Sequence, residues 1–167
     1  MNPRQQHLFK LVASDRERED YFALRQAIFT VEQGIFPNND QDAWDAEAYP
    51  IIAVDREQVV GVVRIYEESP GLWYGGRLGV HAQYRRGGRI GQGLIYKAVT
   101  TAHGWGCQRF LATVQEQNVR FFARLHWHTL QEVILHGHLH HLMEADLAHY
   151  PPGCEERPPQ RGGVLLC

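Results

Sequence analysis

A turn crowded with arginine and glycine, followed directly by an amphipathic segment, constrains the fold of this chain more than any other feature. Residues 85–91 hold three arginines and three glycines. From Ile90 to Ala102 apolar residues recur at the spacing of one helical face, and Gly104 marks the expected end. The N–H groups of a first helical turn lack internal partners and attract negative charge. The segment therefore predicts a phosphate-binding turn between a strand ending near Val80 and a core helix; a basic surface turn is the competing interpretation.

Length and composition fit one globular domain. The chain has 167 residues, of which 44% are hydrophobic, and a net charge of -2. A charge so close to zero favours no nucleic-acid partner. No apolar run is long enough to span a bilayer, and the first ten residues lack a signal-peptide core, so we expect a cytoplasmic protein without a membrane partner. Three widely spaced cysteines fit neither a disulfide framework nor a zinc site, and Cys107 is expected to be buried.

Alternating patterns predict an α/β fold with a mixed sheet. A capping box of Ser14 and Glu17 opens a long helix that ends near Gly34. A short helix is expected over residues 118–127, and the segment around the central helix reads as a βαβ unit with parallel strands. Glycines 75, 76 and 79 indicate a bulge or a close backbone approach in their strand. The buried stripe of the first helix is expected at Tyr21, Leu24, Ile28 and Val31. Strands are expected near residues 7–12, 51–54, 59–66, 72–80, 110–114, 132–135 and 139–145.

Proline and glycine mark the end of the chain. We expect one domain over residues 1–150 and an irregular tail over residues 151–167, lying across the surface or a partner. The tail and exposed strand edges leave a homodimer open.

An acidic segment lies between the first helix and the second strand. Two interpretations remain open: a solvated loop, or an acidic rim that attracts a cationic amine. Its spacing does not match a calcium loop. Its carboxylates are Asp40, Asp42, Asp45 and Glu47.

Histidines crowd residues 126–141. His136, His138 and His140 alternate, so a strand would place them on one face, where they could hold a metal. No carboxylate or cysteine shares their spacing, and we expect surface or substrate-side histidines and no metal.

The Arg/Gly turn resembles the signature of the GNAT family, the acyl-CoA-dependent N-acetyltransferases. That signature reads Gln/Arg-x-x-Gly-x-Gly/Ala between the family's fourth strand and third helix. Counted back from Gly91, Arg86 takes the first position and Arg89 stands where the middle glycine is usual. Counted forward from Val80, Arg85 takes the first position and the turn is one residue longer. Residues 114–127 resemble the family's Asn…Phe-Tyr-x-x-x-Gly-Phe segment, and the resemblance extends to about Tyr150.

Two shorter runs resemble one branch of the family. Residues 28–33, IFTVEQ, and residues 76–78, GRL, are similar to the branch that includes the ElaA-like proteins and acyl-homoserine-lactone synthases. The chain is more closely similar to the nitrogen-starvation-associated N-acetyltransferase subfamily.

The resemblance implies the GNAT acyl-CoA N-acyltransferase fold, with a mixed sheet of six to seven strands flanked by about four helices. It also implies acetyl-CoA as the co-substrate. The pantetheine arm would lie between splayed fourth and fifth strands, and the pyrophosphate on the amides of the turn. The residues that this places at CoA are Leu78, Gly79, Val80, Arg85, Arg86, Gly87, Gly88, Arg89, Ile90, Gly91, Asn118 and Phe122.

The implied activity is transfer of an acetyl group from acetyl-CoA to the primary amine of a small molecule, by direct attack in a ternary complex. A base must take the proton of the amine. Glu116 is the first candidate, although a solvated carboxylate at a helix start explains it equally well. Arg77 could bind a substrate carboxylate or pair with the acidic segment. Tyr74 and His81 are further candidates.

Phe122 stands where the family often carries a tyrosine that protonates the leaving thiolate. A phenylalanine cannot donate a proton, which favours an alternative: a non-catalytic sensor or interaction module that binds acyl-CoA. A third alternative, suggested by the branch resemblance, is a synthase of the acyl-homoserine-lactone type.

Overall fold

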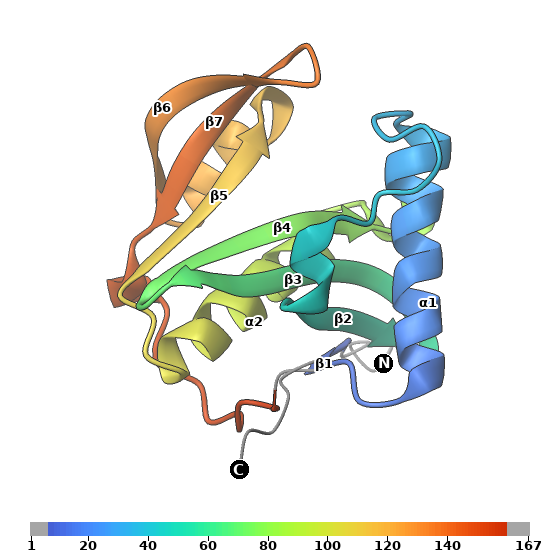
Figure 1. The fold of residues 1–167 in the computed structure, drawn as a ribbon, viewed down its shortest axis with the longest axis horizontal. Helices are drawn as coiled ribbons and strands as arrows, with labels where there is room; N and C mark the ends of the chain where they lie inside the picture. The colour runs from blue at the N-terminus through green and yellow to red at the C-terminus, as the bar shows by residue number, and fades with distance from the viewer. Residues whose placement is uncertain (1–6, 160–167) are drawn as a thin grey trace, which may run out of the picture.

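The structure of the protein, a computed structural model, describes residues 7–159 and has one seven-stranded sheet (Figure 1). The strands lie in the order β1-β2-β3-β4-β5-β7-β6, and every pair is antiparallel except β4 and β5. The predicted mixed sheet and the parallel pair are therefore confirmed. The strands are β1 (Leu8–Leu11), β2 (Tyr49–Asp55), β3 (Gln58–Ser69), β4 (Leu72–Val80), β5 (Arg109–Gln115), β6 (Trp127–Leu135) and β7 (His138–Ala145).

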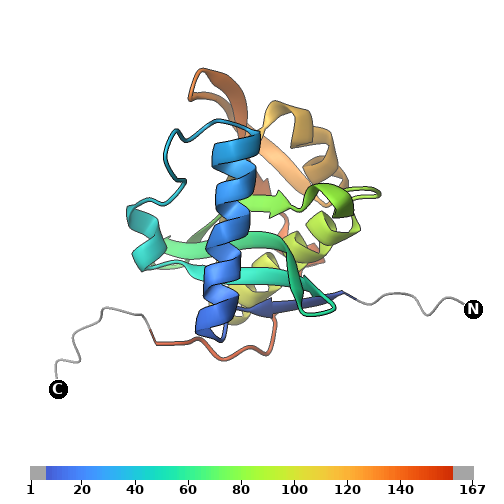
Figure 2. The same cartoon turned by 90° about the vertical axis from the view of Figure 1, so that its right-hand side faces the viewer.

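Three α-helices accompany the sheet in the described part of the chain, where about four helices were expected: α1 (Asp15–Arg25), α2 (Arg89–Gly104) and α3 (Val119–Arg124). The capping box is confirmed, since the Ser14 hydroxyl accepts a hydrogen bond from the Glu17 N–H at 3.1 Å. Figure 2 shows α1 lying across the strands, on the face opposite α2. Neighbouring residues of β2 point to opposite faces, so Ile51 packs in the core with α2 and Ile52 in the core with α1.

The first helix changes its winding after Arg25. Residues Gln26–Glu32 form a π-helix, in which the Gln33 N–H bonds to the carbonyl of Ile28, five residues back. Each wider turn holds more residues and rotates the later side chains around the axis. Ile28 and Phe29 are therefore both buried, whereas Val31, expected on the buried stripe, is 77% exposed.

The short helix expected over residues 118–127 is also shorter than predicted. It ends at Arg124, and Trp127 already begins β6. A left-handed residue, His126 with φ 71°, turns the chain between them.

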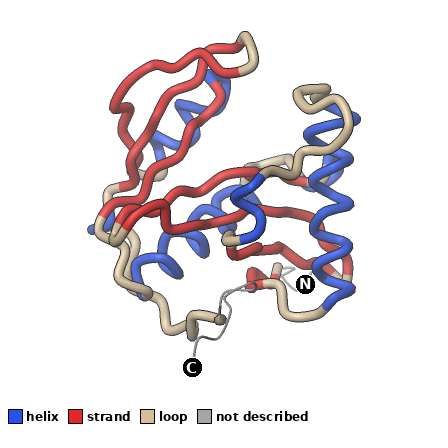
Figure 3. The backbone as a smooth tube through the Cα atoms, in the orientation of Figure 1, coloured by secondary structure: helices blue, strands red, loops and turns tan. Residues whose placement is uncertain are grey.

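The sheet opens between β4 and β5. These strands pair only at Leu72–Arg109, Trp73–Phe110 and Tyr74–Leu111, and then diverge (Figure 1). Beyond that point β4 carries a bulge, because the register with β3 shifts between Gly76 and Gly79 and Arg77 has φ 51°. The irregularity predicted from the glycines of β4 is confirmed. The loop after the π-helix and the β6–β7 turn lie at the same end of the molecule (Figure 3). There the rings of Phe36 and His136 pack edge to face, with their centroids 5.2 Å apart.

Residues 151–159 are irregular and lie on the domain. The Gly153 N–H donates to the carbonyl of Thr100 at 2.8 Å. The guanidinium of Arg157 sits 4.9 Å from the ring of Trp73. Cys107 is buried, as predicted. In residues 7–159 we find no helix that is both long enough and apolar enough to cross a membrane.

Candidate active site

The turn between β4 and α2 presents unpaired backbone donors. Gly88 precedes the helix in a left-handed conformation, and no side chain caps the helix start. Within the described chain the N–H groups of Arg89, Ile90 and Gly91 have no backbone partner, whereas the Gln92 N–H already bonds to the carbonyl of Gly88 at 2.9 Å. A Cβ on Gly88 would lie 2.9 Å from the ring of Phe121, so a larger residue does not fit here. Free amides at a helix start suit a phosphate group.

The three arginines of the turn have different surroundings. Arg85 forms an ion pair with Glu32, with one Nη–Oε distance of 2.7 Å, and its Nε donates to the carbonyl of Val80 at 2.8 Å. The hydrogen bond from Arg85 lowers the pKa of Glu32. Arg86 and Arg89 are exposed and form no ion pair with any residue of the described part. Because Arg85 is paired with Glu32, the structure fits the alignment of the turn that starts at Arg86. In that alignment the signature contains Arg86 and Arg89, which are both free to contact a phosphate.

A groove of about 430 Å³ runs from this turn along the free edge of β4. Val80 lies opposite Gly61, and the next residue, His81, donates its N–H to the carbonyl of Val60 at 2.8 Å. Because peptide groups alternate along a strand, the N–H of Val80 points away from β3 and toward the groove. Asn118 and Phe122 line the opposite side. Eight of the twelve residues expected at CoA line this groove: Leu78, Gly79, Val80, Arg85, Gly88, Gly91, Asn118 and Phe122. Arg86, Gly87 and Arg89 lie in the adjoining turn outside the lining, and the side chain of Ile90 is buried in the core.

The π-helix and the residue that follows it form another side of this groove. Ile28 and Gln33 also line it, and a Cβ on Gly79 would lie 2.8 Å from Cδ1 of Ile28. The irregular winding of the first helix and the glycine in β4 therefore allow the two backbones to approach closely.

A second cavity, of about 230 Å³, occupies the opening between β4 and β5. Its lining includes Ala98 and Val99 from α2 on one face of the sheet and Tyr66, Tyr74 and Arg77 on the other. We call it the acceptor cavity. Tyr66 and Tyr74 stack with ring centroids 5.8 Å apart, and burial raises the pKa of both phenols.

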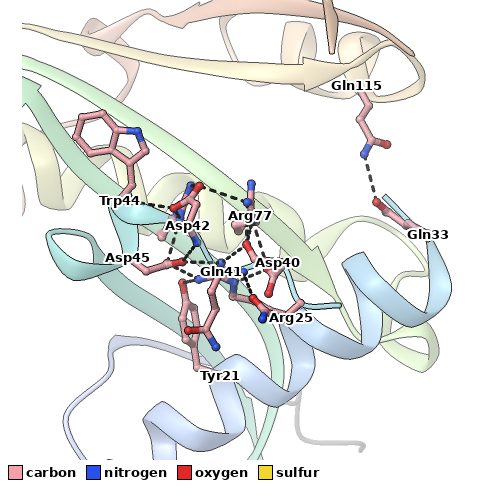
Figure 4. A network of polar contacts seen from close by, with 12 residues as sticks. Tyr21, Arg25, Gln33, Asp40, Gln41, Asp42, Trp44, Asp45, Arg77 and Gln115 are labelled. Carbon is pink, nitrogen blue, oxygen red and sulfur yellow. Dashed lines mark hydrogen bonds and ion pairs between the residues drawn. The ribbon is translucent and has the colours of Figure 1, made fainter. Parts of the chain in front are cut away.

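The acidic segment forms ion pairs with three arginines, Arg25, Arg64 and Arg77, of which Figure 4 labels Arg25 and Arg77. Buried Arg25 bonds to Asp40 at 2.6 Å and to Asp45 at 2.6 Å, and Arg64 bonds to Asp42 at 2.6 Å. Burial alone would raise the pKa of Asp45, but the hydrogen bond and charge of Arg25 outweigh it and hold that pKa below its ordinary value. The segment contains the short helical turn of the solvated-loop interpretation, and Asp42 is exposed although it pairs with Arg64. Asp40 and Asp45, in contrast, are largely buried in ion pairs with Arg25, so the carboxylates do not form a free rim.

Arg77 is the least neutralised member of this cluster. Its short hydrogen bond, at 2.8 Å, goes to the backbone carbonyl of Asp40, whereas its nearest carboxylate oxygens, on Asp40 and Asp42, lie at 3.3 Å. Burial, followed by the charges of Arg64 and Arg25, lowers its pKa. Its guanidinium lies 4.4 Å from the ring of Phe36. Arg77 therefore pairs with the acidic segment, as one alternative predicted, and still lines the acceptor cavity.

Other predicted catalytic residues lie in different places. Tyr74 lines the acceptor cavity, but Glu116 is exposed and belongs to the lining of neither cavity. His81 accepts a hydrogen bond from the Gln83 N–H at 3.2 Å and caps the turn after β4. Phe122 is buried against Trp127, with ring centroids 5.1 Å apart.

The alternating histidines of the last hairpin differ in burial, although His136, His138 and His140 all line one cavity. His136 is exposed in the β6–β7 turn, whereas His140 is buried in β7. Among residues 7–159 no group of three or more His, Cys, Asp or Glu side chains is placed to hold a metal ion.

A pair of glutamines that bridges the opening could not be predicted from the sequence. The Gln115 amide donates to Gln33 at 3.3 Å, from the end of β5 to the end of the π-helix (Figure 4). Gln33 directly follows the π-helix, and sequence periodicity does not report this change of winding.

Comparison with known proteins places this site in context. The model of the acetyltransferase (GNAT) family matches residues 18–127, more than half of the chain. A search of curated proteins gives no significant match.

Several solved structures share the fold. A putative N-acetyltransferase from Lactobacillus plantarum is 20% identical, with a TM-score of 0.75 over 83% of this chain and 97% of that one. Escherichia coli ElaA is 21% identical, with a TM-score of 0.74 over 84% of this chain and 100% of that one. The CoA-dependent acyl-homoserine lactone synthase BjaI, with SAM and isopentyl-CoA, is 15% identical, with a TM-score of 0.69 over 83% and 82%.

Proposed function

This chain belongs to the GNAT acetyltransferase family, and from that premise we propose that it moves an acetyl group from acetyl-CoA to the primary amine of a small molecule, by direct attack in a ternary complex. One observation carries the proposal: the free edge of β4 continues into the unpaired amides of α2 and forms a single groove with them. That groove has donors for phosphate at one end and for a thioester at the other.

The residues of the groove fit CoA. The N–H groups of residues 89–91 and the side chains of Arg86 and Arg89 would hold the pyrophosphate. Leu78 and Val80 would hold the pantetheine arm with main-chain groups. The Val80 N–H would also donate to the thioester oxygen as negative charge develops there. Bound in this way, acetyl-CoA supplies the activated acyl group.

The acceptor cavity favours a small molecule that carries a carboxylate near its amine. The ion pairs of Arg77 with Asp40 and Asp42, at 3.3 Å, are longer than the 2.6 Å pairs of Arg25 and Arg64, so an acceptor carboxylate can compete for its guanidinium. Tyr66 and Tyr74 add aromatic lining to the same cavity. A nucleic acid does not suit a cavity of about 230 Å³.

The leaving thiolate would take its proton from water. Phe122 has no hydroxyl, and in the groove lining the only phenol is that of Tyr84, which already donates to Asp55 at 2.8 Å.

The test is thiol release from acetyl-CoA over a panel of amino acids, simple amines and polyamines, after calorimetry has established that CoA binds. We expect release with amino-acid-like amines and weaker release with amines that lack a carboxylate. Release that ignores the carboxylate would contradict the assignment of Arg77.

Phe122 supports a second candidate function, an acyl-CoA-binding sensor without turnover. Tight CoA binding with no thiol release from any amine of the panel would favour it. The nitrogen-starvation-associated subfamily, a lactone-synthase activity, a homodimer and a cytoplasmic location stay predictions from the sequence.

A further inference from the structure

The acceptor cavity lacks a carboxylate. Within the described chain its ionisable lining residues are Arg64, Arg77, Tyr66, Tyr74, His136 and His140. Arginine side chains stay protonated in proteins. Burial raises the pKa of both tyrosines, so their phenols keep their own protons near neutral pH. Neither phenol can therefore take up a proton from an ammonium group. Imidazole is the one group in this set that ordinarily exchanges a proton between pH 5 and 8.

Its own hydrogen bond fixes the tautomer of His140. Nδ1 of His140 lies 2.9 Å from the backbone carbonyl oxygen of His138. A carbonyl oxygen can only accept, so Nδ1 must carry the hydrogen. In the neutral ring Nε2 then has a free lone pair and is the proton acceptor.

The position of His140 joins two cavities. It is 9% exposed, and it lies opposite Gln115 of β5 in the sheet. It lines the acceptor cavity and also a neighbouring cavity of about 270 Å³. Uncharged glutamines 33, 115 and 117 face it there, together with His136 and His138 of its own hairpin. A proton taken from the acceptor cavity therefore has a polar route outward.

We propose that His140 is the general base of the acyl transfer, an inference that rests on the proposed function. Nε2 of His140 takes one proton from the ammonium group of the acceptor. The free amine nitrogen forms a bond to the thioester carbon, and the bond from that carbon to sulfur breaks. The second proton leaves the nitrogen and ends on the CoA thiolate, through water. His140 returns the first proton to solvent through the outer cavity.

The test compares full-length His140→Gln with the wild type in thiol release. At pH 7 we expect the rate to fall by about 10²- to 10⁴-fold, the usual contribution of a general base. CoA affinity by calorimetry should not change. The deficit should shrink at high pH, because an alkyl amine loses its own proton near about pH 10.4. The wild-type rate should fall on acidification through the range in which imidazoles take up protons.

Two further variants make the result specific. His128→Gln, on the exposed side of β6 with its side chain 61% accessible, is the matched control and should keep the wild-type rate. A wild-type rate and pH profile in His140→Gln would overturn the proposal. Loss of rate in His136→Gln alone would overturn it as well, since the base would then be the other imidazole.

A readout without turnover separates this proposal from the proposed function. Long-range proton–nitrogen NMR spectra of histidine-labelled protein bound to CoA should show His140 with its proton on Nδ1. A proton on Nε2 would overturn the assignment of the base, whether or not the enzyme turns over. Absence of thiol release in the wild type, before any substitution, would instead refute the proposed function and with it the reaction that His140 serves.

Discussion

At the scale of single residues, neighbouring arginines in one turn have separate tasks. Arg85 joins the end of the π-helix to the end of β4 through Glu32 and the carbonyl of Val80. Arg86 and Arg89 have no such partner within residues 7–159. The first is therefore a structural link, and the other two are available to a ligand.

We expect the double substitution Arg86→Ala with Arg89→Ala to weaken CoA binding by about 10- to 100-fold. Two charge-assisted contacts to phosphate are lost, each worth about 1.5–3 kcal/mol when well made and less at an exposed site. Calorimetry at two salt concentrations measures the effect, which should shrink at high salt. Arg16→Ala, at an exposed position in the first turn of α1, is the control. An unchanged affinity would move the phosphate site away from this turn.

At the scale of elements, the acidic segment is held by ion pairs rather than by a hydrophobic face. Its 3-10 turn, Ala43–Ala46, has no fully buried residue, and Arg25 and Arg64 provide the buried partners. Removing one partner leaves a buried charge uncompensated, which is costly.

We expect Asp45→Asn to lower the free energy of unfolding at pH 7 by about 3–5 kcal/mol, because buried Arg25 loses a carboxylate. The wild type should also lose stability in acid. A carboxylate with a lowered pKa stabilises the fold at any pH above its unfolded value, about 3.9, and loses this contribution as pH falls through the folded value. Asp42 and Asp45 both have lowered pKa values.

Denaturant titrations from pH 7 down to pH 3 measure both effects. The cost of Asp45→Asn should be largest at pH 7 and should shrink in acid. Glu19→Gln, on the exposed surface of α1, is the control. A cost that is independent of pH would mean that the charge of Asp45 contributes little.

Most elements could be predicted from the sequence because their signals are local. The apolar stripe of α2, the capping box of Ser14 and Glu17, and the glycines of β4 each lie within one short segment. The change to a π-helix is a difference of one residue per turn, which periodicity does not resolve.

The candidate site was predicted in part for the same reason. The phosphate turn is contiguous in sequence, so its residues could be named in advance. The partners of the acidic segment lie 15 to 37 residues away from it, as in the pairs Arg25–Asp40 and Arg77–Asp40. No pattern in one sequence reports contacts over such distances, and the placement of Glu116 outside both cavities is likewise a result of the fold.

At the scale of the whole molecule, residues 151–159 are part of the packed structure. Gly104 of α2 lies against Gly153 so closely that an added Cβ would be 2.4 Å from the Gly153 carbonyl oxygen. Arg157 then reaches Tyr49 and Glu67 at 3.0 and 3.2 Å.

We expect Gly104→Ala to destabilise the protein by about 1–3 kcal/mol, because the backbone of the tail must move to make room. Alanine in place of glycine in a free helix would instead stabilise it by up to about 1 kcal/mol, so the sign of the change is informative. Thermal unfolding and the rate of cleavage after Glu156 by a glutamate-specific protease measure it. Gln92→Ala, exposed on α2, is the control. A higher melting temperature without faster cleavage would show that the tail does not need this contact.

The opening between β4 and β5 divides the sheet into two parts, β1 to β4 and β5 to β7, that pair at only three positions. Three residue pairs join the two sides of the gap at one end, and the Gln33–Gln115 hydrogen bond and the Phe36–His136 ring contact join them at the other. An extended ligand that lies between the diverging strands and has amide groups of its own would hydrogen-bond to both of them. It would take the place of a strand, and the sheet would then be continuous across the opening. Occupancy of the groove would then change the mechanical stiffness of the molecule, so the empty protein should open along this seam first.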